Sequence, residues 1–386
     1  MTASISQLRD WNLDDLTNTA LRLRLGAADM NQSALSIING LGGIDTDWQG
    51  DTRDHAEVRA KDLASSMEEK ARRWNKASMV LDTAAQQMGL LRDEIIRHVD
   101  DPENQRLFAI SDNDVVTIRT DIDAYDESVL DRRRTLEDTL HTLLLTVDTA
   151  GQMYDWQVTN ALMGVTDSQR PFQPKMPPPR DLPTTGDQSA RARADREGSG
   201  DEQWDTWKTP LSDDIKMQAV RAFWKEGGEF GSTKGMENFS RLLDHFFDNT
   251  GTQATVSVDA MFRDLPGFQS GTNDLSRKAT EAARNVMPEG YKGPVAFQSE
   301  YDGSYTPEWT EHPDWFFALG TFTYQTSGVA MPSDTGNYNI AAQTTVYDYY
   351  NFDARGRLGM LNDLNRAGWA RTFDTTGTSS TQWVTP

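Results

Sequence analysis

The densest group of side chains that could do chemistry lies near the C-terminal end of the chain, in VYDYYNFDARGR, residues 346–357. If this segment ends a β-strand, Asp348 and Tyr350 lie on one face, because strand side chains alternate with a period of two. Asp353 and Arg357 follow directly along the chain. Carboxylates beside arginines and phenols suit a catalytic site for a phosphate substrate, with a divalent cation such as Mg²⁺ as its cofactor. The alternative is a polar strand end whose charged groups pair with one another.

The chain has five histidines, which are the other candidates for acid–base chemistry. None forms an H-x-x-x-H pair and the chain has no cysteine, which argues against a zinc site. His312, in the segment EHPD before an aromatic run, joins the candidate catalytic residues. His245 lies beside Asp244 and two phenylalanines on an expected helix, where a histidine more often belongs to a core or its rim.

Aromatic and β-branched residues indicate the strands that must position these groups. From about residue 294 the sequence has β character, with strands expected over 315–324 and 340–350 and a turn at 332–337. Helices are expected in the same part of the chain over residues 215–224, 236–247, 274–286 and 357–371. A Thr- and Ser-rich tail follows. The pattern predicts an α+β domain with an antiparallel β region over residues 204–386.

The first part of the chain has the apolar spacing of long amphipathic helices. Apolar residues recur every three or four positions from Leu13 to Leu41 and from Ala60 to Met88, which predicts two helices joined by a turn that contains glycine. The second helix is expected to reach Val99, where Asp-Asp-Pro ends it. A short extended excursion is expected over 107–119 and a further long helix over 136–154.

These elements predict a multidomain protein. Residues 1–164 form an all-α, elongated helical bundle, and residues 165–203 form a linker rich in proline and charge. The linker has no periodic apolar positions with which to bury a core.

Composition narrows the classes of function. The 386 residues suffice for two domains, and the formal net charge of −21 argues against a nucleic-acid partner, because phosphates would be repelled. The N-terminal segment carries charges where a Sec signal peptide has its apolar region. No apolar run approaches the ~18–20 residues that a membrane span needs.

The turn between the two long helices contains Trp48-Gln49-Gly50. This arrangement resembles the helix–Trp-X-Gly–helix hairpin of the ESX-type family, the substrates of type VII secretion. The resemblance implies a delivery domain, with Trp48 and Gly50 as turn and targeting residues. It also implies a small helical partner or a secretion chaperone. The family's export tag, Tyr-x-x-x-Asp/Glu, is missing, since Tyr125 and Tyr154 are followed at that offset by valines. The resemblance then implies that a partner supplies the signal.

Most of residues 235–380 resemble a module found at the C-termini of secreted bacterial polymorphic toxins, on the strength of NFSRLLDHF, the aromatic strands and the closing LNDLNRAGWARTF. A remoter resemblance is to the colicin M type catalytic domain, which cleaves the lipid-linked peptidoglycan precursor. Asp348, Tyr350 and Asn351 fall on its Asp-x-Tyr-Asp motif, with asparagine replacing the second aspartate. Asn365-Arg366 is the nearest match to its His-Arg. The toxin resemblance implies a cognate immunity protein.

Together these observations predict a bacteriocin-like toxin of interbacterial competition, secreted by a type VII system without a Sec signal and acting at the target-cell envelope. Its effector domain is expected to hydrolyse a lipid-linked cell-wall precursor, that is, a phosphoester or diphosphate bond. Two alternatives stay open: a non-enzymatic membrane-perturbing or binding module, and a structural secretion-associated protein. An enzyme would lose toxicity through Asp348→Ala alone, whereas a membrane-active fold would not.

Overall fold

A computed structural model describes residues 4–42, 51–166, 169–180, 204–205, 218, 235–333, 337–352 and 359–384 of the chain. The protein folds as two compact units. The first, Met1–Lys175 with Ala283–Ala296, is mainly helical, and the second, Met176–Ala282 with Phe297–Pro386, combines helices with a sheet. The predicted fold class, a multidomain protein with an all-α part followed by an α+β part, is therefore confirmed. Sequence analysis placed residues 283–296 in the second part, whereas the structure groups them with the first.

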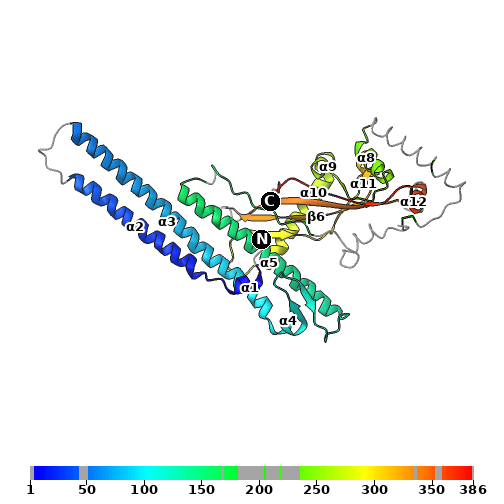
Figure 1. The fold of residues 1–386 in the computed structure, drawn as a ribbon, viewed down its shortest axis with the longest axis horizontal. Coiled ribbons are helices and arrows are strands. Elements are labelled where there is room, and N and C mark those ends of the chain that lie inside the picture. The colour runs from blue at the N-terminus through cyan, green and yellow to red at the C-terminus, as the bar shows by residue number, and fades with distance from the viewer. Residues whose placement is uncertain are drawn as a thin grey trace. The chain divides into compact units, whose positions relative to one another are not determined.

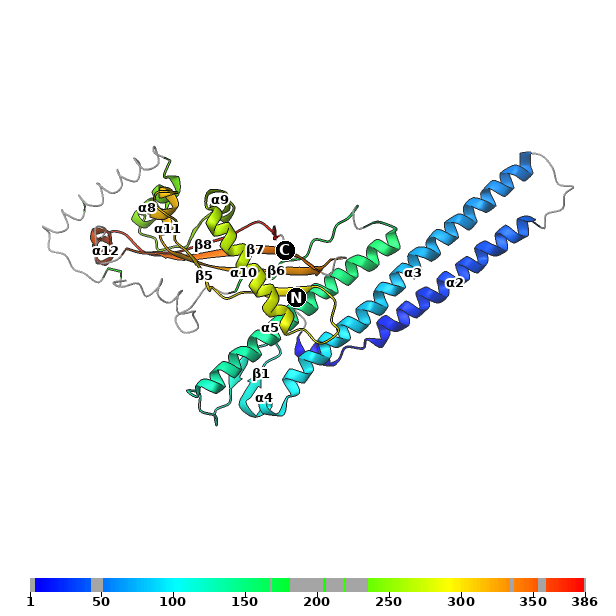
Figure 2. The same cartoon turned by 180° about the vertical axis from the view of Figure 1, so that it is seen from behind.

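The helical unit is built on a long antiparallel hairpin (Figures 1 and 2). Its elements are α1 (Ile5–Arg9), α2 (Asp14–Gly42), α3 (Asp51–Asp100), α4 (Pro102–Leu107), β1 (Phe108–Ile110), β2 (Val116–Ile118) and α5 (Glu127–Met163). Helices α2 and α3 lie side by side, and α5 packs along α3. At about 1.5 Å per residue, the 50 residues of α3 extend for roughly 75 Å. Strands β1 and β2 pair antiparallel, which confirms the extended excursion predicted over 107–119.

Small side chains line the interface between α2 and α3. On α2, Ala20, Ala27 and Ala34 are fully buried at a spacing of seven residues. On α3 the buried small residues are Ala64, Ala71, Ala77 and Ala84. The apolar spacing predicted these positions, with one exception: Leu63 is 54% exposed and its neighbour Ala64 faces α2 instead. Alanine permits close approach of two helix backbones, so this seam is narrow.

Larger side chains form the core at the base of the helical unit. The second half of α3, helices α1 and α5 and the β1–β2 hairpin supply Leu91, Ile95, Phe108, Leu140 and Leu143, all essentially without solvent exposure. Residues 283–296 add to this core through partly buried apolar side chains. The backbone of this segment is held by two hydrogen bonds, from Lys292 N to Gln87 Oε1 at 2.6 Å and from Ala296 N to Thr146 Oγ1 at 3.2 Å.

The described part of the predicted linker, residues 169–180, makes specific contacts. The ring of Phe172 lies 5.5 Å from that of Trp156 in the helical unit. In the second unit, Gln298 Nε2 donates to the carbonyl of Pro178 at 2.6 Å. Arg180 forms an ion pair of 2.9 Å with Glu300. Residues 181–203 lie outside the described part of the chain.

The second unit is organised around a seven-stranded sheet with the order β3-β8-β7-β6-β4. Strand β5 also pairs with β6, and β9 with β7. The strands are β3 (Ala254–Thr255), β4 (Val295–Gln298), β5 (Gly303–Tyr305), β6 (Phe322–Pro332), β7 (Tyr338–Tyr350), β8 (Phe373–Thr378) and β9 (Gln382–Val384). The long strands β6 and β7 pair antiparallel from Thr323–Tyr347 to Pro332–Tyr338. Strand β3 pairs parallel with β8 and forms one edge of the sheet.

The helices described in this unit are α8 (Glu237–Phe247), α9 (Val258–Asp264), α10 (Pro266–Asn285), α11 (Pro313–Leu319) and α12 (Gly359–Arg366). Aromatic side chains fill the core between helices and sheet, among them Phe246, Phe268 and Trp315 of the helices and Phe322 and Phe373 of the strands, all with almost no exposure. The core therefore joins segments that are more than a hundred residues apart in the sequence.

One prediction of local structure in this unit was wrong. Residues 315–319, expected to begin a strand, belong to helix α11, and the strand starts only at Phe322. Pro313 occupies the first turn, where proline favours a helix, and Trp315, Ala318 and Leu319 bury one helical face. The Thr- and Ser-rich tail after α12, for which no element was predicted, supplies strands β8 and β9. The helix predicted over 215–224 lies outside the described residues except for Gln218.

Candidate functional site

Asp348 and Tyr350 lie on the same face of β7, as predicted, and both are buried. Strand β8 places Thr375 opposite Asp348 and Phe373 opposite Tyr350. The ring of Tyr350 stacks on that of Phe373 with centroids 4.8 Å apart and an interplanar angle of 17°. Phe246 of α8 meets the Tyr350 ring edge-on at 6.2 Å. Tyr350 is therefore part of the aromatic core, with Asp348 next to it on the strand.

Burial controls the protonation of the Tyr350 hydroxyl. Removal from water raises the pKa of the Tyr350 phenol far above its usual range, and the negative charge of Asp348 raises it further. The phenol thus stays protonated and can only donate or share a proton. Among the described residues, neither the Tyr350 hydroxyl nor the Thr375 hydroxyl has a hydrogen-bond partner. Such groups are uncommon in a core, because an unpaired buried hydroxyl is costly.

The segment after β7 is anchored by α12. Asn362 Nδ2 donates to the carbonyl of Phe352 at 2.8 Å. Asn365 is buried, and its side-chain oxygen accepts from Thr372 N at 3.2 Å. Arg366 pairs with Asp363 within α12 at 3.6 Å. The Asn365-Arg366 pair, noted for its similarity to a catalytic His-Arg, therefore lies on a helix, where both residues have structural contacts.

His312 occupies the N-cap position of α11. Its Nδ1 accepts from Trp315 N at 3.5 Å, and its Nε2 lies 3.8 Å from Asp264 Oδ2. The same carboxylate oxygen accepts from Trp315 Nε1 at 3.0 Å. The contacts of His312 are thus those of a helix cap, and Asp264 links this cap to α9. Asp353 and Arg357 of the predicted site, and the turn residues Trp48 and Gly50, lie outside the described residues.

Asp314, which sequence reasoning passed over, joins α11 to α8. Its buried carboxylate accepts from Asn238 N at 3.1 Å, Asn238 Nδ2 at 2.9 Å and Phe239 N at 2.8 Å. The two backbone amides belong to the first turn of α8, where N–H groups have no partner within the helix. The N-cap residue of α8, Met236, makes no side-chain hydrogen bond to them. The negative charge of the carboxylate also interacts favourably with the positive, N-terminal end of the α8 helix dipole. Asp314 is visible in the sequence EHPDW as an acidic residue directly before a tryptophan. The residue that it contacts, Asn238, lies 76 positions earlier in the chain.

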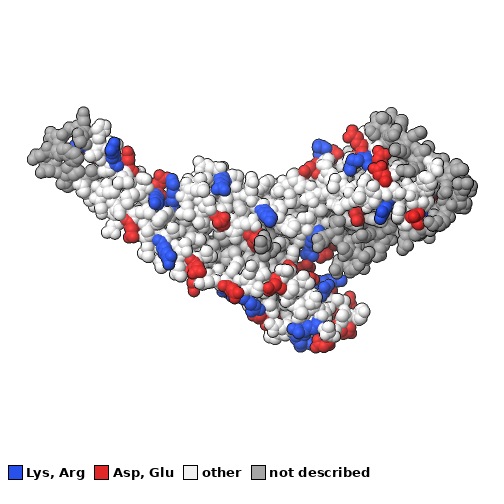
Figure 3. Space-filling view, viewed as in Figure 1, with Lys and Arg blue, Asp and Glu red and all other residues white. Residues whose placement is uncertain are grey.

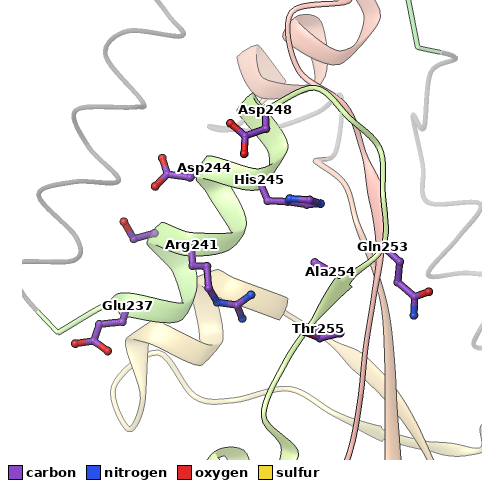
Figure 4. Close-up of a pocket in the computed structure, with 9 residues that line it drawn as sticks. Glu237, Arg241, Asp244, His245, Asp248, Gln253, Ala254 and Thr255 are labelled. Atoms are coloured by element: carbon purple, nitrogen blue, oxygen red, sulfur yellow. The ribbon is translucent and has the colours of Figure 1, made fainter.

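A cavity of about 580 Å³ lies between α8 and the edge strand β3 (Figure 4). Its lining is polar and consists of Glu237, Ser240, Arg241, Asp244, His245, Asp248, Gln253, Ala254 and Thr255. Arg241 and His245, one helical turn apart, extend from α8 toward β3 (Figure 4). His245 Nε2 donates to the carbonyl of Thr252 at 2.8 Å, and its ring meets Phe373 edge-on at 4.5 Å. The ring is therefore held in place with Nε2 as the donor.

Sequence reasoning weighed His245 as a core or rim residue and did not select the other residues of this cavity. Arg241, Asp244 and Asp248 alternate with buried leucines and phenylalanines along α8, so they have the pattern of an ordinary solvated helix face. What makes them a cavity is β3, which follows α8 closely in the sequence and is held in place by its pairing with the distant strand β8. The available signal was the Arg241–His245 spacing of four residues.

Within the described ranges, no cluster of three or more His, Asp or Glu side chains is arranged to hold a metal ion. None of the helices described is both long and apolar enough to cross a membrane. The fold and its sites thus define a two-unit protein, with an all-α unit built on a long hairpin and an α+β unit that carries a polar cavity at a sheet edge. Comparisons with protein-family models, curated proteins and solved structures gave no match.

Proposed function

We propose that the chain is an antibacterial toxin secreted by a type VII system, in which the helical unit serves delivery and the α+β unit is the effector. The observation that carries this proposal is the division into two compact units of different construction, one of which is a long helical hairpin with apolar side chains on its outer surface. A hairpin of this kind suits docking to a helical partner, and an autonomous α+β core suits an effector.

The outer surface of the hairpin supports the delivery role. Leu21, Leu25 and Leu35 of α2 and Val58 and Leu63 of α3 are each about half exposed or more, although the seam between the helices is already filled by alanines. On the face drawn in Figure 3, charged side chains of the hairpin are interspersed with wide uncharged stretches. Exposed aliphatic side chains on one element mark a surface that another protein can cover. The proposed occupant is a small helical partner or secretion chaperone.

The Asp348 group supports an enzymatic effector. A buried carboxylate beside two hydroxyls that have no partner among the described residues is a set in which the carboxylate can exchange a proton and the hydroxyls can donate hydrogen bonds. In this proposal Asp348 is the acid–base residue, the hydroxyls of Tyr350 and Thr375 are donors for a bound substrate, and Asp353 and Arg357, which follow along the chain, are the further candidates. The bond broken is a phosphoester or diphosphate of a lipid-linked cell-wall precursor in the target envelope.

A non-enzymatic effector is the second candidate, because Asp348 and Tyr350 lie inside an aromatic core. In that case Asp348 serves the fold, and the toxic activity lies in binding or in perturbing a membrane. The two candidates separate through Asp348→Asn, which preserves shape and removes charge.

The effector test expresses the full chain in the cytoplasm and, with an added export signal, in the periplasm of a test bacterium. We expect growth inhibition only from the periplasm. Asp348→Asn should reduce it by about 10²–10⁴ if the residue is an acid–base group. Asp302→Asn, an exposed aspartate of the same unit, is the matched control. If an equally stable Asp348→Asn protein still inhibits growth, the enzymatic candidate fails. If the wild type does not inhibit growth in either compartment, the toxin proposal fails.

The delivery test uses Leu25→Glu with Leu35→Glu, because both side chains are exposed and the changes should leave the hairpin folded. In a producer with a type VII system, export should be lost while the thermal midpoint is unchanged. Val115→Glu, an exposed apolar residue elsewhere in the helical unit, is the control and should be exported. Normal export of the double variant would contradict the docking role of this surface.

A further inference from the structure

We propose that the cavity between α8 and β3 binds the C-terminal end of an extended peptide. Its carboxylate is held by Arg241, and its backbone adds to the open edge of β3. This inference rests on the cavity alone and stands whether or not the chain is a secreted toxin.

The guanidinium of Arg241 is available for a ligand. Glu237 and Asp244 lie four residues before it and three after it on α8, the spacings at which helix ion pairs normally form. Even so, Arg241 makes no ion pair or hydrogen bond with any residue that the structure describes. Figure 4 shows why: the Arg241 side chain runs toward β3, whereas Glu237 and Asp244 project from α8 away from that strand.

A second cavity, of about 500 Å³ in the helical unit, shows the opposite arrangement. It contains three arginines, and each has a carboxylate partner: Arg9 pairs with Asp100, Arg92 with Asp93 and Arg97 with Glu94. Those arginines stabilise their surroundings and have few donors left. Arg241 keeps all five N–H donors of a guanidinium, whose fork matches a carboxylate.

The charges of the α8–β3 cavity limit the anion that it can take. Arg241 lies on the β3 side, whereas Glu237 and Asp244 project away from that strand. A polyanion such as a nucleotide would extend beyond one guanidinium toward these acidic residues and be disfavoured. A single carboxylate matches Arg241 alone.

The edge of β3 favours a peptide among ligands that carry a carboxylate. Val256 N donates to Thr376 O at 2.9 Å, so the backbone groups of alternate residues face β8. In a parallel pair the N–H and C=O of the intervening Thr255 then face the opposite side. No described strand pairs with that side of β3. An extended peptide can therefore bond to Thr255 by strand addition, and a volume of about 580 Å³ lies within the usual ~300–1,000 Å³ of ligand sites.

The test measures binding of trialanine to the full chain by calorimetry and by NMR. Two blocked peptides are the comparison: trialanine amide lacks the carboxylate, and N-acetyl-trialanine keeps the carboxylate but lacks the ammonium group. We expect trialanine and N-acetyl-trialanine to bind about 10-fold or more tightly than trialanine amide. Arg241→Gln should weaken trialanine binding by about 10- to 100-fold, because it loses a charge-assisted pair. It should also abolish the difference between trialanine and its amide.

Arg277→Gln is the matched control. Arg277 is an exposed arginine of α10 in the same unit, already paired with Asp274 at 2.8 Å, and its loss should leave binding unchanged. Because Arg241 is exposed, Arg241→Gln should keep the thermal midpoint of the wild type, so lost binding would not reflect unfolding. Equal binding of trialanine and its amide to the wild type would overturn the proposal. So would an absence of binding, or inorganic phosphate that binds as tightly as trialanine.

Discussion

Each of the two units of this protein is stabilised internally by a different kind of packing. The α2–α3 hairpin of the helical unit relies on small residues repeated along neighbouring helices, such as Ala20, Ala27 and Ala34 on α2, with ion pairs on the surface. The α+β unit relies on large aromatic residues from distant segments, such as Phe246, Tyr350 and Phe373. In the first, each turn of helix adds a small and similar contribution. In the second, a few residues carry much of the packing. Single substitutions should therefore be more damaging in the α+β unit.

The largest expected effect comes from Trp315 in the α+β core. Its side chain is fully buried, and its Nε1 donates to Asp264. Trp315→Ala should lower the free energy of unfolding of this unit by about 3–5 kcal/mol, through the cavity and the lost hydrogen bond. Trp309, six residues earlier and 63% exposed, provides the control, since Trp309→Ala should change it by less than about 0.5 kcal/mol. Urea unfolding of both variants measures the difference. Similar losses in the two would contradict the division between core and surface.

The next effect concerns the connection between α8 and α11. Asp314→Ala leaves two first-turn amides and the Asn238 side chain without their shared acceptor, in a buried place. We expect a loss of about 2–3 kcal/mol, the range for hydrogen bonds to a charged group. Asp314→Asn retains one acceptor oxygen and should lose about half as much. If both variants unfold like the wild type, the carboxylate does not serve as the cap of α8.

Sequence reasoning succeeded where structure is local and failed where it depends on distant partners. The three–four spacing predicted the seam of α2 and α3, because burial in a long hairpin follows helical periodicity. The polar strand β8, FDTTGT, has no apolar alternation that would reveal it. It is a strand because β7 and β3 lie on either side of it. The aromatic run after His312 favoured a strand by propensity, but Pro313 and the capping of the first turn made it a helix.

The candidate site shows the same limit. The shared face of Asp348 and Tyr350 follows from strand alternation and was predictable. The burial of Tyr350 under Phe246 and beside Phe373 depends on a helix and a strand elsewhere in the chain. Arg241 and His245 were readable as one face of α8, but no local pattern indicates that an unpaired sheet edge lies opposite. The cavity is formed by two elements that are close in the sequence, but the position of β3 depends on its pairing with the distant strand β8, which no pattern in α8 or β3 reveals.

A smaller effect tests the seam of the hairpin. A Cβ on Gly26 would lie 2.5 Å from Cζ3 of Trp74, so Gly26→Ala must displace the indole. The substitution should destabilise the helical unit by about 1–2 kcal/mol, despite the better helix propensity of alanine. In a Trp74→Leu background the obstacle is gone, and the same change should stabilise by about 0.5–1 kcal/mol. Thermal unfolding of the four proteins gives the coupling. A stabilising Gly26→Ala in the wild type would show that the indole moves freely and that the seam is loose.

The smallest expected effect is a pH dependence in the helical unit, at His98 near the end of α3. Burial is the main cause that lowers the pKa of His98, and the neighbouring Arg97 lowers it further, against the opposing attraction of Glu94 and Asp101. Because the folded protein then binds a proton less readily than the unfolded chain, stability should fall as the pH falls through about 6.5, the ordinary pKa of histidine. The loss should be below about 1 kcal/mol, since the His98 side chain is 24% exposed and water screens its charge. Urea unfolding of wild type and His98→Gln between pH 7.5 and 5.5 measures it, and only the wild type should show this component. A wild type that gains stability relative to His98→Gln at pH 5.5 would mean that the 3.3 Å contact with Glu94, and not burial, dominates. In that case surface ion pairs would contribute substantially to the stability of the helical unit. The comparison with the aromatic core of the α+β unit would then have to include them.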